Sequence, residues 1–199
     1  MNKKIIAVIM AAVLVFGVAV GATIAYLTSS TATVTNTFTV GDIAITLTES
    51  EINTEGTGLV TPDNQVTTQN NKYKVVPGSN ITFKNPRVTF TKDSEPCWLF
   101  VKIEENADWA SAGMSYEIAD VWTELEANSG IYYIELANAT ETTEDTAYFI
   151  LKDNTIIVPA TLTNTQLEKA KTANLTFTAY AIQHENLEDA DAAWTALGN

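Results

Sequence analysis

The sequence has little of the chemistry on which most enzyme active sites depend. Its 199 residues contain one cysteine, Cys97, and one histidine, His184. A single cysteine cannot form an intramolecular disulfide, and a single histidine cannot supply the paired imidazoles of a common zinc-peptidase site. No Gly-x-Ser-x-Gly nucleophile motif is present. We therefore predict no catalytic residues, no metal site and no cofactor, and expect a protein that is not an enzyme.

Basic residues are also scarce. Lysine and arginine total 11 against 24 aspartates and glutamates, which gives a formal net charge of −13. Phosphate backbones and anionic lipid headgroups repel such a chain. Acidic runs at residues 141–145 and 185–191 match no calcium-loop spacing, and they favour a solvated face over a calcium site. We predict no nucleic-acid partner, and contact with a membrane only before N-terminal processing.

The N-terminal segment differs from the rest of the chain. No charged residue occurs in residues 5–41, and an unbroken apolar run covers residues 5–20 after two lysines. A positive end, an apolar stretch and small residues ahead of a cleavage point are the three parts of a secretory signal peptide. Thr23 and Ala25 fit the small positions that a signal peptidase requires. We predict a signal helix over residues 1–25, with cleavage between Ala25 and Tyr26.

Retention of this segment as a membrane anchor is the alternative. Residues 5–27 are long enough, because a bilayer core needs about 20 apolar residues. Gly21 and Ala22 interrupt the apolar run where a processing site would lie, and no charged stop-transfer cluster follows, which favours cleavage. In both cases the remaining chain lies outside the cytoplasm. We expect a secreted, extracellular or cell-surface protein.

The exported part is rich in residues that favour strands. Thirty threonines occur in the chain, together with many valines, isoleucines and aromatic residues, which fit a pleated, half-buried surface. Alternating polarity and turn signals predict short strands at residues 43–49, 81–83, 87–91, 97–105, 115–119, 121–125, 131–136, 147–151, 155–158 and 175–183. Capping signals predict two helices, at residues 163–171 and 187–197.

This pattern of many short strands is typical of an antiparallel β-sandwich. We predict a Thr-rich segment at residues 26–41, followed by a single β-sandwich domain at residues 42–199 with a polar loop at about 50–74. In residues 97–105, one apolar face begins at Cys97, while Trp98 and Phe100 face the other way. That strand is therefore expected to be buried on both faces at its start and on one face at its end.

Three motifs resemble those of a known group of proteins. Residues 21–45 (GATIAYLTSSTATVTNTFTVGDIAI) are similar to the export and early mature region of the TasA/camelysin family. Residues 76–79 (VPGS) resemble the Pro-Gly turn of that family, and residues 175–183 resemble its closing strand. Its members are Gram-positive bacterial proteins with SipW-dependent signal peptides, released by an ER-type signal peptidase. The middle of this chain departs from the family pattern.

The resemblance implies a jelly-roll-like sandwich, export, and fibres of the biofilm matrix in which the N-terminal segment of one subunit adds as a strand to its neighbour. Here that role would fall to residues 28–40, an uncharged β-prone segment whose main chain can satisfy an open sheet edge. The partner would be a second copy or a related matrix subunit. The candidate assembly strand consists of Thr35, Asn36, Thr37, Phe38, Thr39 and Val40.

Two functions therefore remain open from the sequence. The first is an exported structural protein that forms fibres by N-terminal strand addition after removal of the signal peptide. The alternative is a monomeric secreted binding module that uses the loop at residues 51–74.

Overall fold

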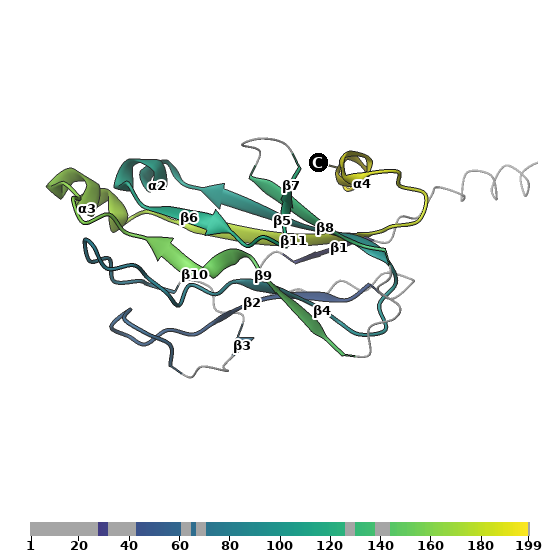
Figure 1. Cartoon of the computed structure of the whole chain (residues 1–199), viewed down its shortest axis with the longest axis horizontal. Helices are drawn as coiled ribbons and strands as arrows, with labels where there is room; N and C mark the ends of the chain where they lie inside the picture. The colour runs from purple at the N-terminus through teal and green to yellow at the C-terminus, as the bar shows by residue number, and fades with distance from the viewer. Residues whose placement is uncertain are drawn as a thin grey trace, which may run out of the picture.

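The structure, a computed structural model, describes residues 28–31, 43–60, 65–66, 71–125, 130–137 and 144–198. Within these ranges the chain forms eleven strands and three short helices (Figure 1). Every strand pairing among them is antiparallel. The prediction of an all-β protein is therefore confirmed at the level of class, although the described residues contain three short helices where one or two were predicted. The predicted signal helix, residues 1–25, lies outside the described residues.

The larger sheet has five strands in the order β1-β11-β5-β8-β7. These strands are β1 (Thr28–Thr31), β11 (Leu175–Gln183), β5 (Cys97–Glu105), β8 (Ile131–Leu136) and β7 (Thr123–Glu124). The two nine-residue strands, β5 and β11, pair along their whole length, with Cys97 opposite Gln183 and Glu105 opposite Leu175. This long ladder forms the centre of the sheet.

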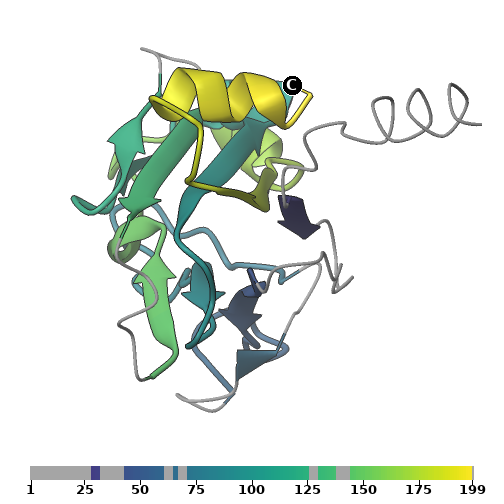
Figure 2. The ribbon, with the colours of Figure 1, turned by 90° about the vertical axis from the view of Figure 1, so that its right-hand side faces the viewer.

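The second sheet has four strands in the order β3-β2-β4-β9. They are β3 (Gln65–Val66), β2 (Ile45–Ser50), β4 (Arg87–Phe90) and β9 (Thr146–Phe149). A separate pair joins β6 (Ser115–Ile118) to β10 (Leu151–Ile157). The two larger sheets lie in separate layers, which Figures 1 and 2 show from perpendicular directions. The arrangement is a β-sandwich.

The main core lies between these sheets. Val88 and Phe90 of β4 belong to the same buried cluster as Leu99 and Val101 of β5 and Ala179 of β11, and each is at most 1% exposed. Burial of a large apolar side chain contributes about 1.5–3 kcal/mol to folding, so these residues hold the sheets together.

A second buried cluster covers the outer face of the larger sheet. Trp98 and Phe100 of β5 pack there with Leu187 and with Ala193 of helix α4 (Ala190–Ala196). The first five residues of β5 are thus all buried, whereas its last two are exposed. The prediction that this strand is buried on both faces at its start and on one face at its end is confirmed.

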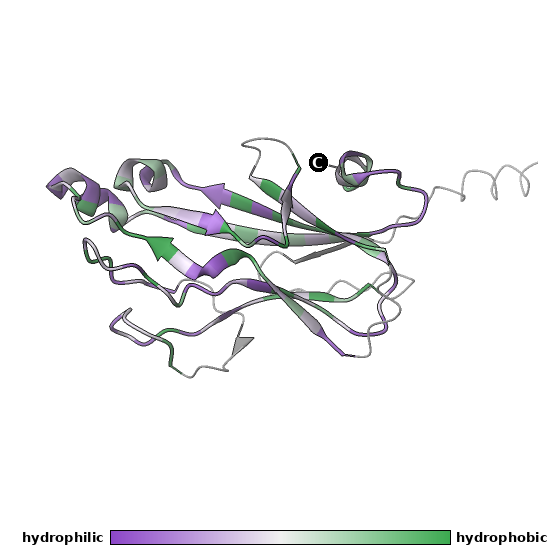
Figure 3. Cartoon of the chain, viewed as in Figure 1, coloured by the Kyte–Doolittle hydropathy of each residue, from purple (hydrophilic) through white to green (hydrophobic). Residues whose placement is uncertain are grey.

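Helix α3 (Asn164–Ala170) begins with the predicted capping box. The Thr163 hydroxyl accepts a hydrogen bond from the Gln166 N–H at 3.3 Å, and the Gln166 side chain accepts one from the Thr163 N–H at 2.9 Å. No residue of α3 is buried, in agreement with its largely hydrophilic colouring in Figure 3. The second predicted helix is also present, as the shorter α4.

Helix α2 (Ala107–Ala112) was not predicted from the sequence. It is six residues long, too short to show an apolar period. The Asn106 side chain caps it by accepting a hydrogen bond from the Trp109 N–H at 3.1 Å. The helix packs against α3, and Lys169 forms an ion pair with Asp108 at 2.7 Å. The Asn106 cap and the contacts with α3 therefore stabilise this helix.

Several strand boundaries differ from the predicted ones. Residues 81–83 form only an isolated bridge from Ile81 to Ile156, and the strand predicted at residues 121–125 shortens to the two residues of β7. Residues 146–157 form β9 and β10, with a register shift in the pairing of β10. Short strands have few local signals, so partners elsewhere in the chain determine where they end.

The polar segment at about 50–74 is not simply a loop. Ser50 ends β2 and is fully buried, and β3 lies within the segment. Ile52 also forms a bridge with Leu59. Side-chain hydrogen bonds, rather than apolar alternation, hold the described parts of the segment against the sandwich.

Candidate functional site

The outer edge of β11 is the first candidate site. β1 pairs with one half of this edge, with Thr28 opposite Ile182 and Thr31 opposite Ala179. Residues 175–178 of β11 have no strand along this edge among the described residues. An open edge presents unpaired N–H and C=O groups that can bind another extended chain. Within the part of the chain that the structure describes, β1 covers half of this edge.

This edge lies where the two sheets approach each other. Both β1 and β11 lie beside β2 of the second sheet. Along β11, Leu175, Phe177, Ala179 and Ala181 pack into the main core, whereas Tyr180 packs into the outer cluster. A strand added at this edge would therefore extend the larger sheet alongside the core.

The structure describes only part of the predicted assembly segment. Thr28–Thr31 belong to the tract at residues 28–40, and their main chain forms β1. The candidate assembly strand, residues 35–40, and the predicted cleavage residues Ala25 and Tyr26 lie outside the described residues. The pairing of β1 with β11 was not predicted, because the TSST sequence of β1 has no apolar alternation to indicate a partner.

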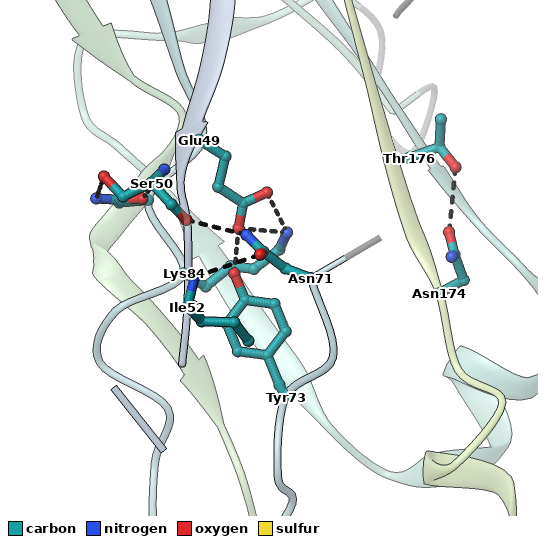
Figure 4. Close-up of polar contacts among 9 residues, drawn as sticks. Glu49, Ser50, Ile52, Asn71, Tyr73, Lys84, Asn174 and Thr176 are labelled. Atoms are coloured by element: carbon teal, nitrogen blue, oxygen red, sulfur yellow. Dashed lines mark hydrogen bonds and ion pairs between the residues drawn. The ribbon is translucent and has the colours of Figure 1, made fainter. Parts of the chain in front are cut away.

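A polar cluster that is largely buried lies around Glu49 of β2 (Figure 4), and its Lys84 approaches the Phe177 ring of β11. The Lys84 ammonium is 2.9 Å from each oxygen of the Glu49 carboxylate, and both side chains are almost fully buried. The Tyr73 hydroxyl donates a hydrogen bond to the same carboxylate. The ammonium also lies 5.1 Å from the ring centroids of Tyr73 and Phe177. Burial, with the Glu49 charge as a further cause, raises the pKa of Tyr73 far above its usual range.

Two asparagines complete this cluster. The Asn71 amide donates to the Ser50 carbonyl at 3.0 Å and accepts from the Ile52 N–H at 3.4 Å. Asn85 accepts from the Ser50 N–H and donates to the Ser50 hydroxyl, both at 3.0 Å. Sequence reasoning missed this cluster, because its members are distributed along a polar stretch with no fixed spacing.

Cysteine and histidine are common catalytic residues, but Cys97 and His184 lie in different parts of the sandwich. Cys97 is fully buried in the main core, and burial raises the pKa of its thiol to about 12. His184 follows β11, and its Nε2 lies 2.8 Å from Glu135 Oε1. Its imidazole stacks on Trp98, which belongs to the outer cluster. Cys97 is thus enclosed as a small apolar residue of the core, and His184 lies directly after the end of β11.

Neither a metal-binding cluster nor a membrane-spanning helix occurs in the described ranges. No three histidine, cysteine, aspartate or glutamate side chains gather there in a group able to hold a metal ion. The helices of these ranges are too short or too polar to cross a membrane.

Comparison with known proteins gives no match, either to a family model, to a curated protein or to a solved structure.

Proposed function

We propose that this chain is an exported structural protein of the cell surface or biofilm matrix, which assembles by adding its N-terminal segment to the β11 edge of another subunit. The partner is a second copy of the chain or a related subunit. The resemblance of residues 21–45 to the TasA/camelysin family supports export after cleavage between Ala25 and Tyr26 by an ER-type signal peptidase.

The observation that carries the proposal is the pairing of β1 with β11. In this pairing the main chain of Thr28–Thr31 lies along the β11 edge in a defined antiparallel register, which supports the proposal. The same register is available to the identical tract of a neighbour, since main-chain hydrogen bonds do not depend on which molecule supplies the strand. Among the described residues no strand pairs with residues 175–178 on this side of β11, which leaves room in the register for a longer segment than β1.

Two finer features belong to the same proposal. We propose that the strands follow a jelly-roll-like order and that residues 1–25 form a signal helix. Both follow from the family resemblance. The β-sandwich and the short helices α3 and α4 are compatible with them.

Paired cysteines test the strand addition directly. Ser30 and Tyr180 are register partners, and paired strand residues lie close enough for a disulfide. In mixtures of the Ser30→Cys and Tyr180→Cys chains, strand addition between subunits gives disulfide-linked heterodimers under mild oxidation. The buried Cys97 does not compete. A Ser30→Cys chain mixed with Val121→Cys is the control, because Val121 is 48% exposed and lies just before β7, at the opposite end of the larger sheet.

Sedimentation of the processed chain at increasing concentration supplies the second readout. Fibres that disappear on deletion of residues 28–40 support the proposal. A chain that remains monomeric, with disulfides formed only within the Ser30→Cys/Tyr180→Cys double variant, contradicts it. That result would favour the monomeric binding module instead.

A further inference from the structure

The outer edge of β11 already has an occupant along half of its length. β1 pairs with residues 179–182, whereas no described strand pairs with residues 175–178 on that side (Figure 1). One edge of a strand accepts only one neighbouring strand, because the hydrogen-bonding groups along it all point to the same side. A segment of another subunit that takes the register of β1 can therefore pair with residues 179–182 only after β1 has left them.

The two strands that flank β11 are held unequally. β5 pairs with all nine residues of β11, and residues from both strands pack into the main core. β1 pairs with four residues, and its sequence, TSST, contains no apolar residue. Its attachment therefore depends largely on main-chain hydrogen bonds, each of which contributes little net free energy. β1 is thus the strand that can leave β11 without opening the core.

The open half of the edge is in place to receive a strand. β5 holds residues 175–178 from their other side. Leu175 and Phe177 also pack against the main core, and the Lys84 ammonium lies 5.1 Å from the centroid of the Phe177 ring. An extended segment can therefore pair with residues 175–178 without a prior rearrangement of β11, and such preorganisation favours binding.

We propose that β1 is a removable cover of the assembly edge, and that a strand from a second copy of the chain pairs first with residues 175–178. In the register of β1, residues 32–35 of the incoming copy pair with this open half, and its residues 28–31 then take the place of β1. The inference rests on the proposed strand addition. It adds a starting point for that addition and its control by the chain's own strand.

The cover explains how one chain holds both a donor strand and an acceptor edge. A long open edge pairs readily with unrelated extended chains. In the described part of a single subunit, β1 reduces the open part of the β11 edge to four residues. Assembly is then slowed by the release of β1, and it proceeds only with a strand long enough to pair beyond the open half.

Separate donor and acceptor chains test the displacement. The donor carries Ser30→Cys and the acceptor carries Tyr180→Cys, so a disulfide between them reports addition of the donor strand to the acceptor edge. Two acceptors are compared, one with the complete N-terminal segment and one without residues 28–31. The shortened acceptor should form heterodimers about tenfold faster under mild oxidation, because no main-chain hydrogen bonds have to break first. A shortened acceptor with Val121→Cys in place of Tyr180→Cys is the control for random collision.

Proline substitutions in the complete acceptor give the same test without a deletion. Ser29 and Ser30 are adjacent, so the N–H of one of them points toward β11. Either Ser29→Pro or Ser30→Pro should therefore remove a hydrogen bond of the β1 pairing and accelerate formation of the heterodimer. Circular dichroism confirms that each acceptor is folded.

Val34→Pro in the donor tests the starting point. In the register of β1, residue 34 of the donor pairs with Thr176 in the open half of the edge. The substitution should slow heterodimer formation strongly with the complete acceptor. It should have little effect with the shortened acceptor, since a strand that displaces nothing can begin to pair anywhere along the edge.

The outcomes separate this inference from strand addition itself. Heterodimers that form at equal rates on the two acceptors would overturn the cover and leave strand addition intact. An equal effect of Val34→Pro on both acceptors would overturn the role of residues 175–178 as the starting point. The absence of heterodimers from every pair would contradict strand addition, and the cover with it.

Discussion

The imidazole of His184 stacks on the indole of Trp98, with ring centroids 5.1 Å apart and planes inclined by 15°. The contact joins the end of β11 to the start of β5, where the His184 N–H also donates to the Pro96 carbonyl at 2.9 Å. Glu135 of β8 reaches the same imidazole. A residue outside any strand thus joins three strands of the larger sheet.

We expect His184→Ala to lower the free energy of unfolding by about 1 kcal/mol, chiefly through loss of the aromatic contact. Glu135→Gln should have a smaller effect, since the Glu135 side chain is 50% exposed and exposed ion pairs contribute little. His184→Phe retains a stacking ring and serves as the control. Denaturant unfolding measures all three, and a larger loss for Glu135→Gln than for His184→Ala would contradict this assignment.

Because the Cys97 thiol is buried, we expect the free energy of unfolding to decrease with rising pH in the alkaline range. Burial raises its pKa from 9.0 to about 12, so the unfolded chain releases this proton at lower pH than the folded chain does. The contribution of this thiol to the free energy of unfolding is therefore fully present below about pH 9. As the pH rises toward about 12, the free energy of unfolding falls by up to about 4 kcal/mol. The raised pKa of Tyr73 acts in the same direction.

Unfolding measured at several alkaline pH values checks this prediction. The Cys97→Ala variant should show a shallower decline of stability with pH than the wild-type chain. Thiol reagents at pH 8 should label Cys97 only after denaturation. Rapid labelling of the folded chain would mean that the thiol is not enclosed.

The capping box of α3 gives a prediction with a close control. Thr163→Ala leaves the Gln166 N–H without its hydroxyl acceptor and should cost about 1 kcal/mol of stability. Thr165→Ala removes an exposed hydroxyl from the same helix and should cost nothing, because alanine favours helix interiors. Thermal unfolding of both variants distinguishes the cap from general helix propensity.

The attachment of α4 to the outer face depends on Trp194. The centroid of its ring lies 5.2 Å from that of the Phe100 ring and 5.3 Å from that of the Tyr180 ring. We expect Trp194→Ala to cost about 2–3 kcal/mol and to release α4 locally, because the helix loses its largest apolar contact. Thr195→Ala, an exposed change on the same helix, is the control. Hydrogen exchange should speed up in α4 and stay slow in β4, while equal acceleration in both would indicate global destabilisation instead.

Local patterns in the sequence were enough to predict much of the sandwich. The bounds of β5, β8 and β11 agree with the predicted strands, and the two faces of β5 agree with the alternation of its residues. The capping box of α3 was also predicted correctly. These features succeed because side-chain period and capping depend on residues only a few positions apart.

The candidate sites depend on residues far apart in the chain. Nothing in the sequence indicates that Thr28–Thr31 pair with the C-terminal half of β11, since the contact is made by the main chain and carries no side-chain pattern. The cluster of Glu49, Asn71 and Lys84 is likewise invisible, because its members come from separate segments with no fixed spacing. Composition and local pattern thus determined the β-rich class, the two faces of β5 and one helix cap. Only the tertiary structure decided which edge is half covered and which polar groups share one buried site, because both depend on how distant segments pack.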